Sequence, residues 1–290
     1  MIDGRDHAHA GPKAPPSSSR RSSRVAVLGR GLFGLERPDR MGVRAPFRRA
    51  VKWYLDWNRS LVLDPWLRYF PTVRILRSSA TAHSFRVLDV GCGNGDLATF
   101  LGRPIVGVDL TFTKSEIQRA VPHLSRIRAS ATSLPFRDRS FDCVVSMDML
   151  EHIPAKERSR AVRELFRVAG RLIIIGCPFG PWSAAFDAEA LREEHAKGMD
   201  LGWREEHVRH GTPYMELHTD ILKASSRGEP LMQMSWIDQE GLIGLRIRWK
   251  LQFLIGKDSR IYGPILGPLY WIQARLRPRR GYRRIYVGHS

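Results

Sequence analysis

Short apolar runs alternate with amphipathic stretches through the middle of the chain. Five runs of strand length occur at residues 85–90, 104–109, 126–129, 141–147 and 171–176. Helical spacing separates these runs and is clearest at residues 155–169, where apolar side chains recur on one face. Strands that are apolar throughout and separated by helices are typical of a parallel sheet with helices on both faces. The pattern therefore predicts an α/β fold with a doubly wound, mostly parallel sheet.

The chain before and after this core has a different rhythm. Residues 44–84 show helical spacing with large aromatic anchors, which predicts a cap of N-terminal helices. The anchors are Phe47, Trp53, Trp57, Trp66 and Tyr69. Beyond residue 178 we expect helices at 184–197 and 213–226. Two further strands, expected at 231–236 and 283–288, would bring the sheet to seven.

The stretch from residue 238 to residue 278 fits two patterns. Apolar and polar residues alternate over 245–253 as in a strand, yet Leu245, Trp249 and Phe253 also recur at helical spacing. We favour a helical insertion near the C-terminus. The predicted organisation is a disordered basic tail (1–24), a helical cap (44–84), a ligand-binding core (85–178), and acceptor-side helices with the last two strands (179–290).

Composition places the chain among ordinary globular proteins. Of its 290 residues, 43% are hydrophobic and 26% are charged, which excludes a wholly disordered chain, a collagen and a coiled coil. No run of about 18 uncharged apolar residues occurs, so the sequence predicts no transmembrane helix. Three cysteines are too few for a disulfide framework and favour a reducing compartment. We therefore expect a cytoplasmic protein.

The net charge of +18 is concentrated at the two ends of the chain. Residues 1–50 hold 11 basic and 4 acidic residues, and residues 241–290 hold 11 basic residues and one acidic residue. Basic ends favour an anionic partner such as nucleic acid, an acidic membrane surface or an anionic substrate. Codon bias is the alternative explanation, because 39 of the 47 basic residues are arginine.

One glycine pattern is misleading. Gly29, Gly31 and Gly34 spell G-x-G-x-x-G, the pattern of a dinucleotide-binding loop. That loop opens a helix and is followed about 20 residues later by an acidic residue at the end of a second strand. Here Pro38 follows at once and the next segment has helical spacing. We do not interpret this segment as an NAD site.

A second glycine pattern has the expected context. The strand at 85–90 carries Asp89 and runs into Gly91, Gly93 and Gly95, before a helix predicted to begin near residue 96. Glycines let the backbone turn sharply and leave no side chain between the backbone and a ligand. Asp109 ends the next predicted strand, twenty residues after Asp89. A carboxylate there can accept hydrogen bonds from both hydroxyls of a ribose.

Four segments in order resemble the class I S-adenosylmethionine-dependent methyltransferases. They are 87–95 (VLDVGCGNG), 106–109 (VGVD), 131–142 (ATSLPFRDRSFD) and 149–153 (MLEHI). The resemblance implies a seven-stranded Rossmann-like sheet and S-adenosylmethionine as cofactor. It also implies that Asp89, Gly91, Gly93 and Gly95 hold the methionine part of that cofactor, and that Asp109 binds its ribose.

The resemblance assigns three more positions. Leu110 would pack on the adenine, the backbone at Ala131 would line the adenine end, and the backbone at Met147 would line the amino end. Many relatives carry an acidic residue where this chain has Ser130, which puts a contact with the adenine amino group in doubt.

His152 is the candidate catalytic residue because it follows the fourth strand, near the expected position of the methyl group. An imidazole can act as a general base near neutral pH, and the alternative role is a structural hydrogen bond. Glu205, Glu206, His207 and His210 could fold over the pocket and bind the acceptor or a metal. Their spacing does not match a metal motif, so we predict no metal site. Cys92, Cys143 and Cys177 are interpreted as core residues.

The function expected is methyl transfer to a small molecule, a lipid or a glycan precursor. The alternatives are an RNA methyltransferase and a non-catalytic cofactor-binding regulator. Nucleic acid is the weaker partner, because Asp148-Met-Leu-Glu-His stands where an Asn-Pro-Pro-aromatic motif would follow the fourth strand. The aromatic and basic residues of 241–290 suggest a second partner, an anionic membrane surface in peripheral contact.

Overall fold

The structure is a computed structural model, and it describes most of the chain beyond residue 62. The described residues are 63–78, 84–118, 120–199, 202–227, 231–255, 272, 278 and 281–290. The predicted basic tail, the glycine pattern at 29–34 and the first three aromatic anchors of the cap lie outside them.

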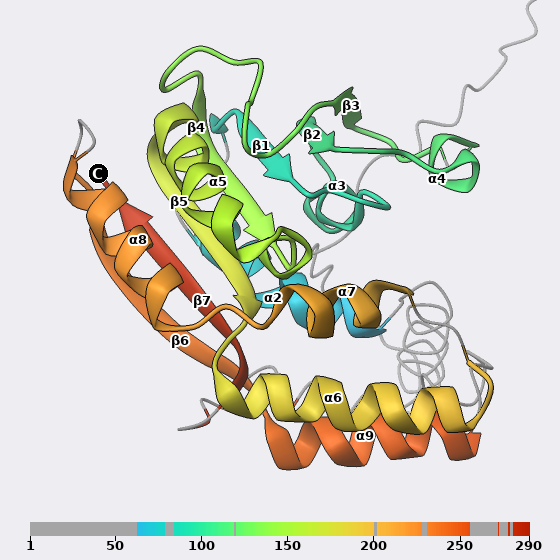
Figure 1. Cartoon of the computed structure of the whole chain (residues 1–290). Coiled ribbons are helices and arrows are strands. Elements are labelled where there is room, and N and C mark those ends of the chain that lie inside the picture. Colours follow the sequence, from blue (N-terminus) through green and yellow to red (C-terminus); the bar gives the residue numbers. More distant parts are fainter. Residues whose placement is uncertain are drawn as a thin grey trace, which may run out of the picture. The chain divides into compact units, whose positions relative to one another are not determined.

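A seven-stranded sheet forms the centre of the described structure (Figure 1). Its strands, in chain order, are β1 (Val87–Val90), β2 (Ile105–Asp109), β3 (Leu124–Arg128), β4 (Phe141–Met147), β5 (Ala169–Pro178), β6 (Gln233–Gly241) and β7 (Gly281–His289). Their order across the sheet is β3-β2-β1-β4-β5-β7-β6. Strands β1 to β5 pair in parallel, and β7 is antiparallel to both β5 and β6. The predicted mostly parallel sheet of seven strands is confirmed.

Helices cover both faces of the sheet. On one face α5 (Ala155–Val168) and α8 (Met215–Arg227) share a hydrophobic core with Val144, and on the other α2 (Leu63–Ser78) and α3 (Asp96–Leu101) share one with Val145. Successive residues of a strand point to opposite faces, so a sheet covered on both sides needs apolar residues throughout. Neither Val144 nor Val145 is exposed at all. This explains why the central runs of the sequence are continuously apolar.

The C-terminal elements differ in part from the prediction. Strand β6 continues to Gly241, so residues 238–241 are strand, and the rest of the ambiguous stretch begins with the predicted helix, α9 (Leu242–Ile255). The extension follows from pairing with β7, where Asp238 lies opposite Arg284 and forms an ion pair with it (2.7 Å). Helix α7 (Gly202–His210) was not predicted, because its sequence has few apolar positions.

Three helices gather beyond the end of β5. Helix α6 (Pro181–Ala196) runs beside α9 (Figure 1), and Phe186, Leu245 and Trp249 pack together between them with Tyr282 of β7. Helix α7 contacts both α6 and η2 (Leu150–His152), the 3-10 turn that follows β4. The short helix α4 (Lys114–Gln118) lies between β2 and β3. Among the described residues, no helix combines the length and apolar character needed to span a membrane.

Candidate functional site

The loop after β1 is built almost entirely from backbone. Gly91, Gly93 and Gly95 have φ angles of 80°, 44° and 78°, a region that favours glycine. A Cβ at Gly91 would lie 2.5 Å from Met149 Cγ, and one at Gly95 would lie 2.4 Å from Leu124 Cδ2. A Cβ at Gly93 would meet no atom within 4 Å. The outer two glycines thus allow close packing, while the middle one faces open space where a ligand can approach the backbone.

Asp109 links this loop to the end of β2. One carboxylate oxygen accepts a hydrogen bond from the Gly93 N–H (2.9 Å), and the other accepts one from the Leu110 N–H (2.8 Å). Each carboxylate oxygen has a second lone pair, so the side chain keeps the capacity to accept from a ribose. Leu110, predicted to pack on an adenine, is 64% exposed beside it. The structure therefore brings Asp109, Leu110 and the middle of the glycine loop together.

Asp89 is a buried carboxylate without a hydrogen bond among the described residues. It lies on β1 with no exposed surface, and neither oxygen has a partner. Burial, followed by the nearby carboxylates of Asp96 and Asp109, raises the pKa of Asp89 to about 8. An unpaired buried carboxylate is costly, and a cationic ligand would satisfy it. This orphaned group fits the predicted role of holding the charged amino end of a cofactor.

Two predicted contacts depend on backbone rather than on side chains. Met147 is buried at the end of β4, where its sulfur lies 3.6 Å from the Thr72 hydroxyl, so its side chain belongs to the core. Ala131 is half-buried in the loop after β3. The hydroxyl of neighbouring Ser130 contacts the Thr132 hydroxyl at 2.9 Å and accepts from the Thr132 N–H. Ser130 thus stabilises its own turn.

The residue that follows β4 is held in an unusual conformation. Asp148 has a φ of 51°, which is rare outside glycine, and its N–H donates to the Gly176 carbonyl (2.8 Å). Its carboxylate accepts a hydrogen bond from Arg283 (2.6 Å) and forms an ion pair with Arg68 (2.9 Å). Although burial raises it, these arginines bring the pKa of Asp148 below its ordinary value. Because Asp148 is fixed in this way, the chain turns sharply into η2.

His152 stands in η2 with both ring nitrogens engaged. Nδ1 lies 2.7 Å from Glu206 Oε2, and Nε2 lies 3.3 Å from His207 Nε2. Burial lowers the pKa of His152, which favours the neutral ring. A base role would require that one of these partners release its nitrogen. The assignment of His152 as general base remains a prediction.

The acidic and histidine residues predicted to fold over the pocket lie on α7. Glu206 reaches His152, as described above. His207 is buried, and its Nδ1 lies 3.1 Å from Asp187 Oδ2. Glu205 points elsewhere and pairs with His195 (2.9 Å), while the His210 carbonyl accepts from Arg158. The fold therefore brings two of the four predicted residues to the end of β4.

Two buried carboxylates near this point were missed. Glu151 lies next to His152 and is fully buried, and neither of its oxygens accepts a hydrogen bond among the described residues. Asp187, on α6, is 1% exposed and also accepts from Tyr282 and Arg204. Glu151 sits beside a candidate histidine in the sequence, which is a usable signal. Nothing local marks Asp187, because its partners lie 17 to 95 residues away.

The C-terminal residues predicted to meet a membrane divide into two groups. The aromatic side chains of Trp249, Tyr282 and Tyr286 are buried. Arg246 pairs with Glu189 on α6, and Arg283 pairs with Glu240 and Asp148. Arg284 pairs with Asp238. These residues serve the fold, whereas Tyr262, Tyr270, Trp271 and the arginines of 275–280 lie outside the described residues. All three cysteines are buried, as predicted.

Comparison with known families decides what the glycine loop belongs to. The family described as a methyltransferase domain matches residues 88–174, from β1 into β5. This segment contains Gly91, Gly93, Gly95 and Asp109, and its strands have the order across the sheet described above. The chain contains a class I methyltransferase domain. Its Rossmann-like sheet places the loop and Asp109 at the carboxyl ends of β1 and β2, the edge where such folds bind ligands.

Curated relatives share this methyltransferase domain. The ubiquinone/menaquinone biosynthesis C-methyltransferase UbiE of Photorhabdus laumondii is 30% identical over 38% of this chain and 51% of its own. The 27-O-demethylrifamycin SV methyltransferase of Amycolatopsis mediterranei is 30% identical over 39% of this chain and 47% of its own. Chloroplastic tocopherol O-methyltransferase of Arabidopsis thaliana is 35% identical over 31% of this chain and 29% of its own. The chain thus spans about half the length of these relatives, or less.

A solved structure also overlaps the methyltransferase domain. A SAM-dependent methyltransferase of Thermotoga maritima covers 84% of this chain and 97% of its own, with a TM-score of 0.47 and 16% identity.

Proposed function

We propose that this protein binds S-adenosylmethionine and transfers its methyl group to a small-molecule acceptor. The observation that carries the proposal is the set of three features at one sheet edge. These are the open backbone at Gly93, the Asp109 carboxylate bonded to that loop, and the orphaned buried carboxylate of Asp89. A ligand with a cationic amino end and a ribose matches both carboxylates. A regulator without catalysis would keep the same pocket, so turnover separates the two.

When bound, S-adenosylmethionine supplies a methyl group on an activated sulfonium. The chain's own contribution is then mainly alignment and the exclusion of water. Asp89 would hold the amino end, Asp109 would fix the ribose, and the loop at Gly93 would allow the ligand to lie against backbone. Helices α6 and α7, which stand beyond the ends of β4 and β5, would cover the acceptor. His152 would act as the base if the acceptor is a hydroxyl.

A small organic acceptor is supported over RNA by two observations. The relatives described above are named for ubiquinone/menaquinone biosynthesis, a demethylrifamycin and tocopherol. In addition, Arg246, Arg283 and Arg284 of the basic C-terminal segment pair with carboxylates rather than forming an open cationic groove. A lipid or glycan precursor fits the same site, and peripheral membrane contact would then rest on residues 256–280.

The cofactor assignment is tested by calorimetry on the full chain. We expect S-adenosylmethionine to bind with one site per chain and NAD to release no heat. Soft-ionisation mass spectrometry of the purified protein should also reveal any co-purified cofactor. Binding of NAD in place of S-adenosylmethionine would overturn the assignment and favour a dinucleotide site at Gly29, Gly31 and Gly34.

The acceptor class is tested by transfer of a labelled methyl group. The protein is incubated with methyl-labelled S-adenosylmethionine and separate fractions of small polar molecules, lipids, and RNA. We expect label in the small-molecule or lipid fraction. Label confined to RNA would favour the alternative function, and binding of cofactor without transfer to any fraction would favour the regulator.

A further inference from the structure

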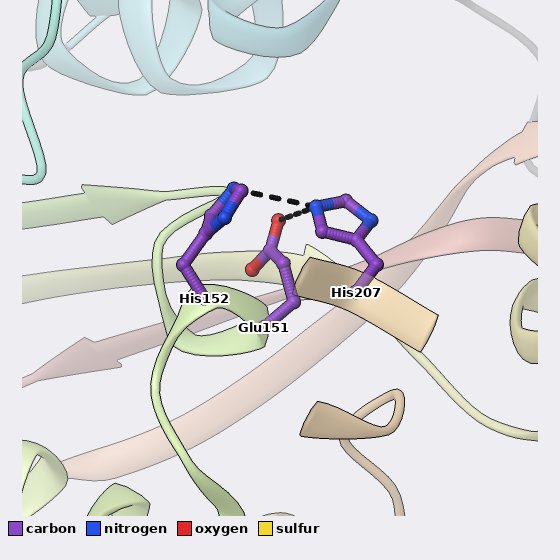
Figure 2. A group of neighbouring side chains, drawn as sticks. All are labelled: Glu151, His152 and His207. Atoms are coloured by element: carbon purple, nitrogen blue, oxygen red, sulfur yellow. Dashed lines mark hydrogen bonds and ion pairs between the residues drawn. The ribbon is translucent and has the colours of Figure 1, made fainter. Parts of the chain in front are cut away.

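Three side chains of metal-binding type converge beyond the end of β4. Glu151 and His152 come from η2, and His207 comes from α7, 55 residues later (Figure 2). His207 Nε2 lies 3.3 Å from His152 Nε2 and 3.8 Å from Glu151 Oε1. One donor atom from each of the three residues lies within 4.8 Å of the others. We call Glu151, His152 and His207 the ligand cluster.

The hydrogen bonds around the cluster fix which nitrogen of each histidine is available. Glu206 accepts from Nδ1 of His152, and Asp187 accepts from Nδ1 of His207. A carboxylate at Nδ1 holds the proton there, so Nε2 carries a lone pair. The two Nε2 lone pairs then face each other at 3.3 Å, an arrangement that a shared cation would stabilise. Metal-bound histidines almost always have such a carboxylate, carbonyl or water partner on the other nitrogen.

Glu151 supplies an independent observation. Its side chain has no exposed surface, and its two oxygens lack hydrogen bonds among the described residues, although one faces His207. A buried carboxylate requires a proton or a cation to neutralise it. The nearest acidic neighbour along the turn, Asp148, is already paired with Arg283 and Arg68. The available carboxylate of this turn is therefore Glu151.

The cluster has supports that hold its two halves together. Arg158 donates to the Leu150 and Ile153 carbonyls of the η2 segment, and to the His210 carbonyl at the end of α7. Arg204 donates to Asp187 (2.9 Å), which in turn orients His207. The site is thus built on packed elements with a buried outer layer of hydrogen bonds, as metal sites require.

We propose that Glu151, His152 and His207 bind one divalent transition-metal ion. Two imidazoles and one carboxylate suit zinc, iron(II) or cobalt(II) better than magnesium or calcium, which prefer oxygen ligands. Ligands about 2.1 Å from a tetrahedral zinc ion lie about 3.4 Å apart. His207 Nε2 lies at similar distances from His152 Nε2 (3.3 Å) and Glu151 Oε1 (3.8 Å). Three protein ligands leave a position open, as in catalytic rather than structural zinc sites.

The open coordination position favours an acceptor with a hydroxyl group. This step rests on the proposed function. The cluster adjoins the cofactor loop, because Met149 packs against Gly91. An acceptor hydroxyl that coordinates there would lose its proton to water more readily, and His152 would then serve as a metal ligand in place of the general base. Its oxygen would then form a bond to the methyl carbon while the carbon–sulfur bond of S-adenosylmethionine breaks. The products are a methyl ether, S-adenosylhomocysteine and the released proton.

Metal binding can be measured without activity. The full chain is stripped with a chelator and titrated with Co²⁺, whose visible absorption reports coordination, and with Zn²⁺ by calorimetry. We expect one ion per chain. His152→Ala and His207→Ala should each weaken binding by more than about 100-fold, beyond the usual cost of losing an outer-layer partner. Glu206→Gln, a half-exposed change that should not affect folding, should weaken it by about 10-fold.

A matched control separates this site from adventitious binding. His195 also pairs with a glutamate, at 2.9 Å from Glu205, but it is half-exposed on α6 and outside the cluster. His195→Ala should bind Co²⁺ as the parent does. Equal loss in this control, or no uptake of Co²⁺ or Zn²⁺ by the parent chain, would overturn the site. S-adenosylmethionine calorimetry on the same preparation reports the proposed function separately: cofactor binding without metal uptake would reject only the metal site, and the reverse only the cofactor assignment.

Discussion

The glycine loop after β1 and the ligand cluster after β4 lie at the same end of the sheet. The first is formed mainly by backbone and the second by side chains. The loop is backbone in left-handed conformations, with the Asp109 carboxylate attached to it. The cluster consists of side chains from η2 and α7, held by buried partners on α6 and β7. A backbone site needs a few residues in one segment, whereas a side-chain site needs several elements to be in place. We therefore expect substitutions in one region to weaken its own ligand binding and to leave binding at the other region nearly unchanged.

The largest effect should come from Arg204, which joins α7 to α6 and orients Asp187 behind the cluster. Its guanidinium is buried and donates to Asp187 (2.9 Å) and Glu194 (2.8 Å). Arg204→Met would remove the guanidinium from two buried carboxylates, at a cost of about 3–5 kcal/mol in the free energy of unfolding. Denaturant unfolding measures this change. Cofactor affinity of the remaining folded protein should stay within about threefold, a difference of less than about 0.7 kcal/mol.

Arg246→Met is the matched control for that experiment. Arg246 pairs with Glu189, but the arginine side chain is 52% exposed. An exposed pair contributes about 0–1 kcal/mol, so this variant should unfold almost as the parent does. If Arg204→Met and Arg246→Met lower the free energy of unfolding by the same amount, the buried network does not stabilise the cluster.

Gly91 is the point where the glycine loop contacts the segment that carries the cluster, so a change there should affect both regions. Gly91→Ala places a methyl group 2.5 Å from Met149 Cγ at a φ of 80°. Left-handed strain of about 1–2 kcal/mol and repacking of about 1–3 kcal/mol should together lower the free energy of unfolding by about 2–5 kcal/mol. Gly102→Ala is the control, with a φ of 65° and open space around the added methyl. It should show the strain alone, and only Gly91→Ala should weaken both cofactor and Co²⁺ binding.

How far the sequence predicts each region follows from the same contrast. The apolar runs predicted the sheet because burial on both faces constrains every residue of a strand. The loop and Asp109 were predictable because a local pattern sets backbone shape. His152 and His207 were named as candidates, but their meeting with Glu151 was not predicted. Asp187 and His207 come together only after α6 and α7 pack, and α7 lacks an apolar stripe. The prediction of no metal site rested on sequence spacing, whereas the burial of Glu151 depends on η2 and its neighbours.

Asp109 tests the cofactor edge alone. Asp109→Ala removes an acceptor from the ribose and also frees the Gly93 N–H. Losing a charge-assisted hydrogen bond should weaken S-adenosylmethionine binding by about 1.5–3 kcal/mol, measured by calorimetry. Co²⁺ uptake should stay within about twofold, about 0.4 kcal/mol, because the cluster has no contact with this carboxylate. Unchanged cofactor affinity would remove Asp109 from the site.

The charge of Asp89 in the protein without cofactor should make the free energy of unfolding depend on pH. Its pKa rises from the ordinary 3.8 to about 8, with burial and then Asp96 and Asp109 as causes, while Arg68 opposes the shift. The folded chain therefore holds a proton that the unfolded chain releases between these values. The stability from this proton is fully present below about pH 4 and is lost as the pH rises towards 8, by up to about 1.4 kcal/mol per pH unit. Asp89→Asn cannot lose that proton, so its free energy of unfolding should fall less steeply between pH 5.5 and 8.5. Parallel slopes for the two proteins in denaturant unfolding would mean that Asp89 is not the buried acid described here. Added cofactor should stabilise the parent chain more than Asp89→Asn. Its cationic groups favour the ionised carboxylate, which only the parent chain can offer.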